Sequence, residues 1–433
     1  MPRKKPLVSV IDAKRDLPGA VKKVLDEHGV DRIIAAKPDE CYVKINAIDF
    51  KPYVYTSPAV IAEVLDYCTA AGARRIFLME NSTQSNMTRL VFEVTGLAAL
   101  AVEHGAEPLY LDEGREANIH LPHLDYDVRV SRHVKHIIDE RDSVTYINLP
   151  KLKTHSMTVM TVGIKNQYGL VAHRDRSVDH NFKLHRKLAD LYSVIQPDFT
   201  LVDGTVVTIH GHYPPEALHK KTLVPLNIIV GGADTVAVDT VCARILGYEV
   251  EEVGHLREAR DMKLGVADLG RIEVRGEPLD RFKEKYPYEL YDAFPHDVEV
   301  IRGSERNCLE GCDANTLALL QVLYLDFEGK GGFTIVMGKG FDRGRIDDIE
   351  GKVLVAGPCA FDEVGDYLAG RLGRKNVLFT RECNDLASTT GALTKLMKVS
   401  PLKMVPLNPV KSLSILVRAK LAGSKARIPP LRW

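Results

Sequence analysis

Four of the seven cysteines stand where their thiolates could meet. Cys308 and Cys312 form a C-x3-C pair just before an expected helix, Cys359 directly follows the strand-like run KVLVAGP, and Cys383 directly follows NVLFTRE. If those two strands are parallel neighbours, both cysteines emerge at the carboxyl edge of one sheet, where open α/β sheets place their ligands. Four converging thiolates suit a [4Fe–4S] cluster or a tetrahedral zinc ion.

The choice between these centres stays open in the sequence, because both take thiolates. Pairs of cysteines that bind zinc more often have two residues between them, and cysteines at the edge of a sheet are unlike those of a zinc ribbon. The iron–sulfur cluster is therefore the first expectation. Unrelated thiols or a redox disulfide pair are the remaining alternatives. Cys41, Cys68 and Cys242 lie in apolar runs, as small buried thiols do.

A second cluster of chemistry lies in the run LPKLKTHSMTVMTVGIKNQYGL, after an expected strand at 144–148. Cations at the carboxyl end of a strand suit a carboxylate or phosphate ligand, and a glycine on each side of a lysine lets backbone approach that ligand closely. A solvated basic loop is the alternative. The candidate anion-binding and catalytic residues of this run are Lys151, Lys153, His155, Lys165 and Asn166.

Three residues elsewhere are expected to line the same crevice. Lys44 and Asn46 follow an early strand and would add to the anion site. Asp203 ends the strand FTLVDG and is a candidate general base or metal ligand, with a turn-forming role before glycine as the alternative. Asp234 is expected to cap a helix. With His155 and Lys165, Asp203 completes the candidate proton-transfer set.

The elements that position these residues alternate strand-like runs with amphipathic helical patterns, which predicts an α/β fold. We expect a large layered α/β domain over residues 1–294. A smaller βαβ-type domain over 295–392 would carry the four cysteines, with strands expected at 333–337, 353–356 and 377–380 and helices at 314–325 and 363–372. A basic tail would follow over 393–433. No Walker A loop, nucleophile elbow or GxGxxG fingerprint is present.

Composition limits the class of protein. The apolar fraction of 45% fits a globular chain, no apolar run is long enough to span a membrane, and the start lacks the apolar region of a secretory signal. Seven cysteines are too few for a disulfide scaffold, so a reducing cytoplasmic location is expected. The net charge of zero hides a tail, residues 386–433, with nine Lys or Arg and no acid. Such a tail could contact a membrane surface or an acidic partner, or wrap the body of the protein.

Several of these motifs occur together in one family. The combination of VKINAIDF, SPAVIAEVLDYCTAAGARRIFLMENS, NLPKLKTH…GIKNQYGL, QPDFTLVDG and GGADTVAVDTVCARILGY resembles the prokaryotic family filed as domain of unknown function 362, over roughly residues 40–270. The resemblance implies an association with ferredoxin-type iron–sulfur modules. This chain lacks the C-x2-C-x2-C run of such modules, so its four late cysteines would replace them. After the VDG turn it reads IHGHYPP in place of an acidic stretch.

These observations predict an iron–sulfur protein, a redox or cluster-assisted enzyme of oxidoreductase type, that acts on a small anionic metabolite. An electron-transfer partner and a homo-oligomer are compatible with it, and nucleic acid is not expected because no reader motif is present. One alternative is a non-redox isomerase or lyase with structural zinc. Another is a binding protein whose tail docks on a membrane or partner.

Overall fold

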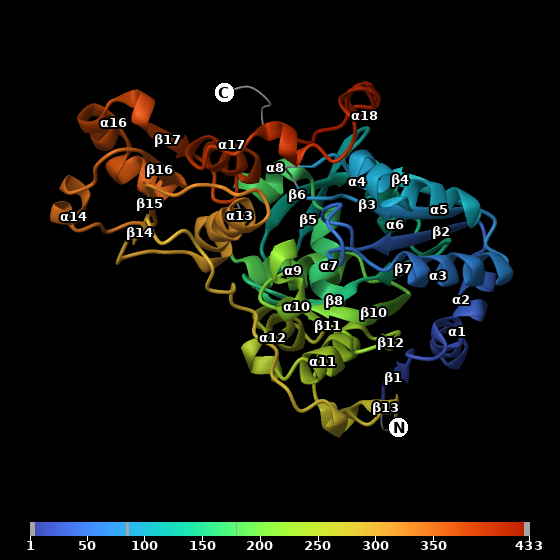
Figure 1. The fold of residues 1–433 in the computed structure, drawn as a ribbon. Helices are drawn as coiled ribbons and strands as arrows, with labels where there is room; N and C mark the ends of the chain where they lie inside the picture. The colour runs from blue at the N-terminus through green and yellow to red at the C-terminus, as the bar shows by residue number, and fades with distance from the viewer. Residues whose placement is uncertain (1–4, 84–85, 179, 428–433) are drawn as a thin grey trace.

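The computed structural model describes residues 5–83, 86–178 and 180–427. The chain forms a large lobe and a smaller lobe, and its C-terminal segment runs back from the small lobe to the large one (Figure 1). Both lobes are α/β, which confirms the expected fold class. None of the helices formed by these residues is long and apolar enough to cross a bilayer.

The large lobe is built on one mixed sheet in the order β13-β1-β12-β10-β7-β2-β3-β4. From β7 to β4 all strands are parallel, β10 is parallel to β7, and β12 is antiparallel to both of its neighbours. The carboxyl ends of β2, β3, β7 and β4 therefore share one edge. The bounds are β1 (Leu7–Asp12), β2 (Glu40–Ile45), β3 (Ile76–Glu80), β4 (Ala106–Tyr110), β7 (Val144–Leu149), β10 (Phe199–Thr208), β12 (Ile228–Gly232) and β13 (Glu273–Gly276).

Shorter strands extend this lobe next to the parallel edge. β8 (Lys151–His155) pairs with β10 and turns back into β9 (Val159–Thr161), and β11 (Leu223–Val224) also pairs with β10. A separate hairpin joins β5 (Glu116–Leu121) to β6 (Tyr126–Ser131). The sequence analysis did not anticipate β8, β9 or the hairpin. β9 has only three residues, too few for a period-2 pattern to show.

Helices cover both faces of the large sheet, and a separate apolar core fills each face. The first core holds residues of α6 (Arg132–Asp139), α7 (Gly163–Asn166), α9 (Leu184–Val194), α11 (Thr235–Ile245) and α12 (Gly254–Asp261). The second holds residues of α1 (Leu17–Glu27), α2 (Val30–Ala36), α3 (Pro58–Ala70), α4 (Thr88–Thr95) and α5 (Leu97–Glu103). Two short helices, α8 (His173–Val178) and α10 (His219–Thr222), lie in loops.

The small lobe is a parallel four-stranded sheet in the order β14-β15-β16-β17. The expected strands β15 (Phe333–Met337), β16 (Val353–Ala356) and β17 (Val377–Thr380) are confirmed, and β14 (Val298–Arg302) is added to them. The helices are α13 (Ala314–Leu325), α14 (Arg343–Asp347), α15 (Pro358–Ala360) and α16 (Asp366–Leu372). Because β16 and β17 are parallel neighbours, the cysteines that follow them share one edge, as the sequence analysis required.

The C-terminal segment, which the sequence analysis expected to be a basic tail, is largely helical. It contains α17 (Leu386–Leu396) and α18 (Pro409–Leu421), so the expected boundary at residue 393 falls inside α17. α17 packs on α13, while α18 packs on α4 of the large lobe. The Oγ of Ser424 donates to Asp112 Oδ2 at 2.6 Å and so fastens the segment to the large lobe. Residues 428–433 of the expected tail lie outside the described residues.

Candidate active site

Two predicted cations of the parallel edge are buried in ion pairs. Lys44, at the end of β2, places its Nζ 2.6 Å from Glu80 Oε1 at the end of β3. Lys151 places its Nζ 3.2 Å from Asp203 Oδ2, and all four side chains are almost completely excluded from solvent. Each of these lysines therefore has its charge matched within the protein.

Asp203 is occupied by structural contacts. Its carboxylate accepts from the backbone N–H of Ser57 at 2.8 Å and of Thr205 at 3.0 Å, besides pairing with Lys151. Burial raises the pKa of Asp203, but Lys151 and these hydrogen bonds outweigh burial and hold the pKa below its usual range. Ser57 lies directly before α3, but its side chain does not cap the helix; its backbone N–H instead joins the start of α3 to Asp203.

A chain of amide side chains joins the elements around the edge. Lys153 Nζ donates to Asn46 Oδ1 at 2.7 Å, and Asn46 Nδ2 donates to Asn166 Oδ1 at 3.0 Å. Asn166 Nδ2 then donates to Asn148 Oδ1 at 2.8 Å. The chain fixes the orientation of each amide, since every donor meets an oxygen. Burial, then the charges of Lys151 and Lys165, hold the pKa of Lys153 well below its usual range.

Lys165 differs from these lysines because no described carboxylate pairs with it. It is partly exposed, and its Nζ lies over the ring of Tyr168, 5.2 Å from the centroid. Burial, reinforced by the positive charges of Arg176 and Lys44, lowers the pKa of Lys165 to about 7. A lysine with this pKa can both bind an anion and exchange a proton near neutral pH.

The backbone that carries Lys165 is fixed by Asp239. The carboxylate of Asp239 accepts from the N–H of Gly163 at 2.8 Å and of Ile164 at 3.0 Å, at the start of α7. A Cβ on Gly163 would lie 2.4 Å from Thr235 Cγ2, so only glycine fits here. Burial raises the pKa of Asp239 to about 7.

Three histidines lie near enough to Lys165 for its charge to lower their pKa values. His155 and His212 stack with ring centroids 3.8 Å apart and an interplanar angle of 9°. Burial is the main cause that keeps the pKa of both well below the usual range, so both rings are neutral. His180 Nδ1–H donates to the carbonyl of Glu310 at 2.6 Å, and burial followed by the charge of Lys165 lowers the pKa of His180 to about 3.

The four cysteines lie in three connecting segments, the cysteine loops, at the carboxyl edge of the small sheet, and none forms a disulfide. Cys308 and Cys312 follow β14, Cys359 lies in the short helix α15, and Cys383 follows β17. Cys308 directly precedes a π-helical turn at 309–313, and Cys312 lies within that turn. Arg306 Nε lies 3.3 Å from Cys308 Sγ. A Cβ on Gly357, which has a φ of +89°, would lie 3.2 Å from Cys312 Sγ. Burial, then Asp313 and the neighbouring Cys308, raise the pKa of Cys312 to about 12.

The donor chemistry and the loops fit a four-thiolate centre, but the side chains do not form a closed one. In the described ranges, no three His, Cys, Asp or Glu side chains are grouped so that they could hold a metal ion. Ligation by Cys308, Cys312, Cys359 and Cys383 would therefore require their side chains to turn toward one another.

The Lys/His loop and the cysteine loops meet where the lobes join. Besides the bond from His180 to Glu310, the N–H of Asn384 donates to the carbonyl of Ser177 at 3.1 Å. The hydroxyl of Ser177 also donates to Glu382. The two candidate centres of the sequence analysis are thus neighbours in space, although 130 or more residues separate them in the chain.

The region that carries the lysines matches a known family. Residues 42–244 match the model described as Domain of unknown function (DUF362). This confirms the resemblance on which the sequence analysis relied. The DUF362 region includes β2 to most of α11 and so holds Lys44, Asn46, Lys165 and Asp203. The four cysteines lie outside it.

Two further similarities accompany the DUF362 match. A curated relative, "Thylakoid-associated protein sll1697" of Synechocystis sp., is 26% identical over 198 residues, which is 44% of this chain and 57% of that protein. The match therefore spans little more than half the length of the relative. Among solved structures, the lactate racemase apoprotein from Thermoanaerobacterium thermosaccharolyticum is similar with a TM-score of 0.39 and 11% identity, over 99% of this chain and 93% of that one.

Sequence reasoning missed several residues that shape the site. Glu80 is the last residue of the parallel strand β3, and Asn148 is the last but one of β7. Their position at the carboxyl ends of these strands was the signal that could have found them. Tyr168 and Arg176 gave no such signal, because they approach Lys165 only through the fold of α7 and α8.

Proposed function

We propose that this chain is an iron–sulfur enzyme that binds a small anionic metabolite beside Lys165, where the two lobes meet. The observation that carries the proposal is the unmatched charge of Lys165. Lys44 and Lys151 have carboxylate partners, whereas no described carboxylate pairs with Lys165 or Lys153.

A third cation, Arg176, strengthens the argument. Its guanidinium donates to the backbone carbonyls of Asn81 and Ser82, and burial lowers the pKa of Arg176 to about 10. Carbonyl oxygens solvate a cation but do not neutralise it. Because buried charge is costly without a counter-charge, an anion between these groups would stabilise the folded protein.

The cysteines supply the redox part of the proposal. Cys308, Cys312, Cys359 and Cys383 would hold a [4Fe–4S] cluster, which accepts or donates one electron or acts as a Lewis acid. Lys165 would bind the anion and exchange a proton, and the neutral rings of His155 and His212 would add no charge to the site.

A non-redox enzyme is the second candidate, and the pKa of Lys165 is the observation that favours it. A lysine that titrates near pH 7 can move a proton alone, as in isomerase or lyase chemistry. In that case the cysteines would bind structural zinc.

Metal analysis after anaerobic purification tests the cluster. We expect about four irons and four sulfides per chain and a visible charge-transfer absorbance that is lost when the four cysteines are changed to Ser. The control Cys242→Ala alters a buried thiol of the large lobe and should keep the absorbance. One zinc and no iron would support the second candidate. Colour that persists in the four-cysteine variant would contradict the ligand set.

Anion binding tests the Lys165 site separately. Phosphate and succinate should raise the Tm of the wild type with a saturable dependence, because a ligand of the native state stabilises it. Lys165→Met should remove that rise. Lys283→Met, which changes an exposed lysine of the same lobe, should keep it. Equal shifts in all three proteins would contradict the site.

A further inference from the structure

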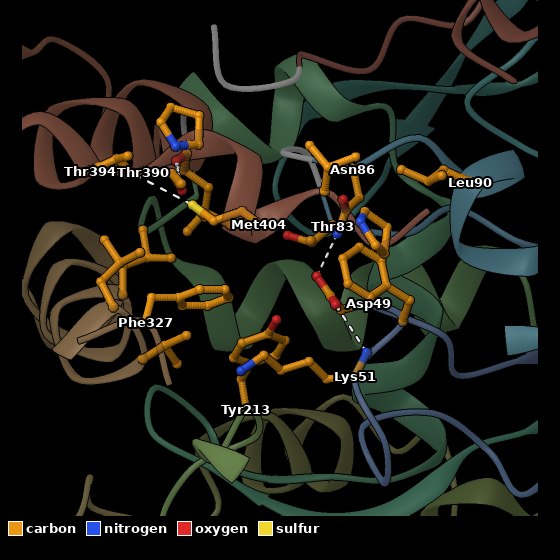
Figure 2. Close-up of a pocket in the computed structure, with 18 of the residues that line it drawn as sticks. Asp49, Lys51, Thr83, Asn86, Leu90, Tyr213, Phe327, Thr390, Thr394 and Met404 are labelled. Carbon is orange, nitrogen blue, oxygen red and sulfur yellow. Dashed lines mark hydrogen bonds between the residues drawn. The ribbon is translucent and has the colours of Figure 1, made fainter. Parts of the chain in front are cut away.

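A cavity of about 380 Å³ lies between the two lobes, apart from the cysteine edge. Its walls come from residues 48–51, the start of α4 and one face of α13. α17, with Thr390 and Thr394, and the C-terminal segment at 401–416 form the roof (Figure 2). This volume is in the range of ligand sites, ~300–1,000 Å³, and is larger than the voids that packing leaves in a core.

The lining determines what kind of molecule fits. Ala318, Leu319 and Val322, which helical spacing places on one face of α13, line the cavity. Phe327 and Met404 continue the apolar surface (Figure 2). The charged groups at the wall already have partners within the protein. Lys51 forms an ion pair with Asp326, and the carboxylate of Asp49 accepts a hydrogen bond from the backbone N–H of Lys51. The body of the ligand must therefore be apolar.

Two buried polar atoms of the wall have no partner in the described structure. They are Nδ2 of Asn315 and Nδ1 of His212. Asn315 lies one turn before Ala318 and Leu319, on the same face of α13, and its Nδ2 can only donate. Since a buried donor without an acceptor is costly, an oxygen of the ligand would be bound here. Neither group carries a charge, because His212 is neutral.

We propose that this cavity binds an uncharged amphiphile, a molecule with an apolar body and one hydroxyl or carbonyl oxygen that accepts a hydrogen bond from Asn315 Nδ2. This second site does not rest on the anion site at Lys165. His212 also stacks on His155, so the two sites share one wall.

Photolabelling tests this site with a dodecan-1-ol that carries a diazirine on its chain. In the full-length wild type we expect crosslinks in peptides of α13 and residues 401–416, and competition by unlabelled dodecan-1-ol. Ala318→Phe fills the cavity and should weaken binding about tenfold. The control Val102→Phe enlarges a side chain that is 67% exposed on α5 and should change nothing.

A second variant, Asn315→Leu, tests the hydrogen bond from Asn315 to the ligand oxygen, and it also tests the site if Ala318→Phe fails to fold. Asn315→Leu removes the donor and should weaken competition by dodecan-1-ol about fivefold, but not competition by dodecane. Absence of crosslinks at the cavity, or labelling that Ala318→Phe leaves unchanged, would overturn the site. Equal loss of alcohol and alkane binding in Asn315→Leu would overturn the polar contact. Loss of phosphate binding in Lys165→Met with normal photolabelling would show that the two sites are independent.

The solvent-facing side of α18, above the cavity, is the basis of a second and independent inference. On α18 the exposed apolar residues are Val410, Leu413, Val417 and Leu421, with exposures of 80%, 60%, 47% and 83%. At 3.6 residues per turn these four side chains fall within an arc of about 80°. The opposite face, with Ile415 and Ala419, is buried against the large lobe. The helix therefore has two apolar faces, and only one is covered.

Cations flank the uncovered stripe. By the same helical spacing, Lys411 and Arg418 lie on one side of it and Lys420 on the other. Arg418 is paired with Glu93 of α4 at 3.4 Å, so Lys411 and Lys420 are the flanking cations that no described carboxylate neutralises. Residues 386–433 contain no Asp or Glu. An apolar stripe between cations is the arrangement of a helix that lies in the plane of an anionic bilayer. We infer that α18 docks the protein on an anionic membrane surface.

Cosedimentation with vesicles tests this docking. Full-length protein should sediment with phosphatidylcholine vesicles that contain about 30 mol% phosphatidylserine, less with pure phosphatidylcholine, and less at high salt. The double variant Leu413→Asp/Val417→Asp should abolish sedimentation, while Val102→Asp should not affect it. Sedimentation of the double variant at the wild-type level would overturn the inference. So would a concentration-dependent dimer that the double variant loses, since a second copy would then cover the stripe.

Discussion

The Nδ1 of His180 lies 2.6 Å from the carbonyl oxygen of Glu310, and this bond joins the Lys/His loop of the large lobe to the cysteine loops of the small one. A carbonyl oxygen only accepts, so Nδ1 of His180 carries the proton and its Nε2 is the unprotonated atom. Burial lowers the pKa of His180 to about 3, which keeps this arrangement across the physiological range. The junction of the lobes is thus fixed by a neutral histidine.

Lys165 should make stability depend on pH. Its pKa falls to about 7 on folding from an ordinary value near 10.5, so between these values the unfolded chain binds one proton more than the folded chain. The free energy of unfolding should therefore rise with pH across this window, by at most about 1.4 kcal/mol per pH unit from this group. Urea unfolding of the wild type and Lys165→Met from pH 7 to pH 10 measures the difference. A constant difference would contradict the lowered pKa.

The His155–His212 stack should contribute acid sensitivity. Both rings have a folded-state pKa well below the usual 6.5, so below about pH 6.5 the unfolded state takes up protons that the folded state does not. Stability should therefore fall as the pH drops below that value. His155→Phe keeps the stacking area and should make this fall shallower. Urea midpoints near pH 7 and pH 5 check it, and an equally steep fall in the variant would contradict the assignment.

The ion pair of Lys44 and Glu80 should be costly to break from one side. Glu80→Gln leaves the buried ammonium without its counter-charge and should reduce the free energy of unfolding by about 3–5 kcal/mol. Adding Lys44→Met should recover much of that loss, because no buried charge then remains. Chemical denaturation of the wild type, the two single variants and the double variant completes a double-mutant cycle, which gives the coupling free energy of Lys44 and Glu80. Additive losses would show that the pair is not coupled.

Gly357 should matter to the cysteine edge beyond its backbone conformation. Its φ of +89° strains any other residue, and an added Cβ would also lie 3.2 Å from Cys312 Sγ. Gly351 is a matched control, with a φ of +74° and nothing within 4 Å of an added Cβ. Both Ala variants should lose about 1 kcal/mol from strain. Only Gly357→Ala should lower the metal content per chain, measured by iron and zinc analysis. Equal metal content in the Gly357→Ala and Gly351→Ala variants would show that this edge of the small sheet does not bind the metal.

Much of the fold followed from the sequence. The strands at 333–337 and 353–356 and the helix at 314–325 were predicted at their observed bounds, because their apolar runs have clear ends. Asp234 caps α11 as expected, with its side chain accepting from Ala237 N–H at 3.0 Å. These features depend on local chemistry, namely periodicity, caps and turn residues, which neighbouring residues determine.

The sequence also determined which side chains carry chemistry, but not how they are used. Lys44, Lys151 and Lys165 look alike in the sequence, yet the first two are neutralised by Glu80 and Asp203 and the third meets no described carboxylate. That difference depends on contacts between residues far apart in the chain. The strength of a charge also depends on its burial, and only the packed structure determines burial. For the same reason, only the tertiary structure brought His180 to Glu310 and left the outer stripe of α18 uncovered.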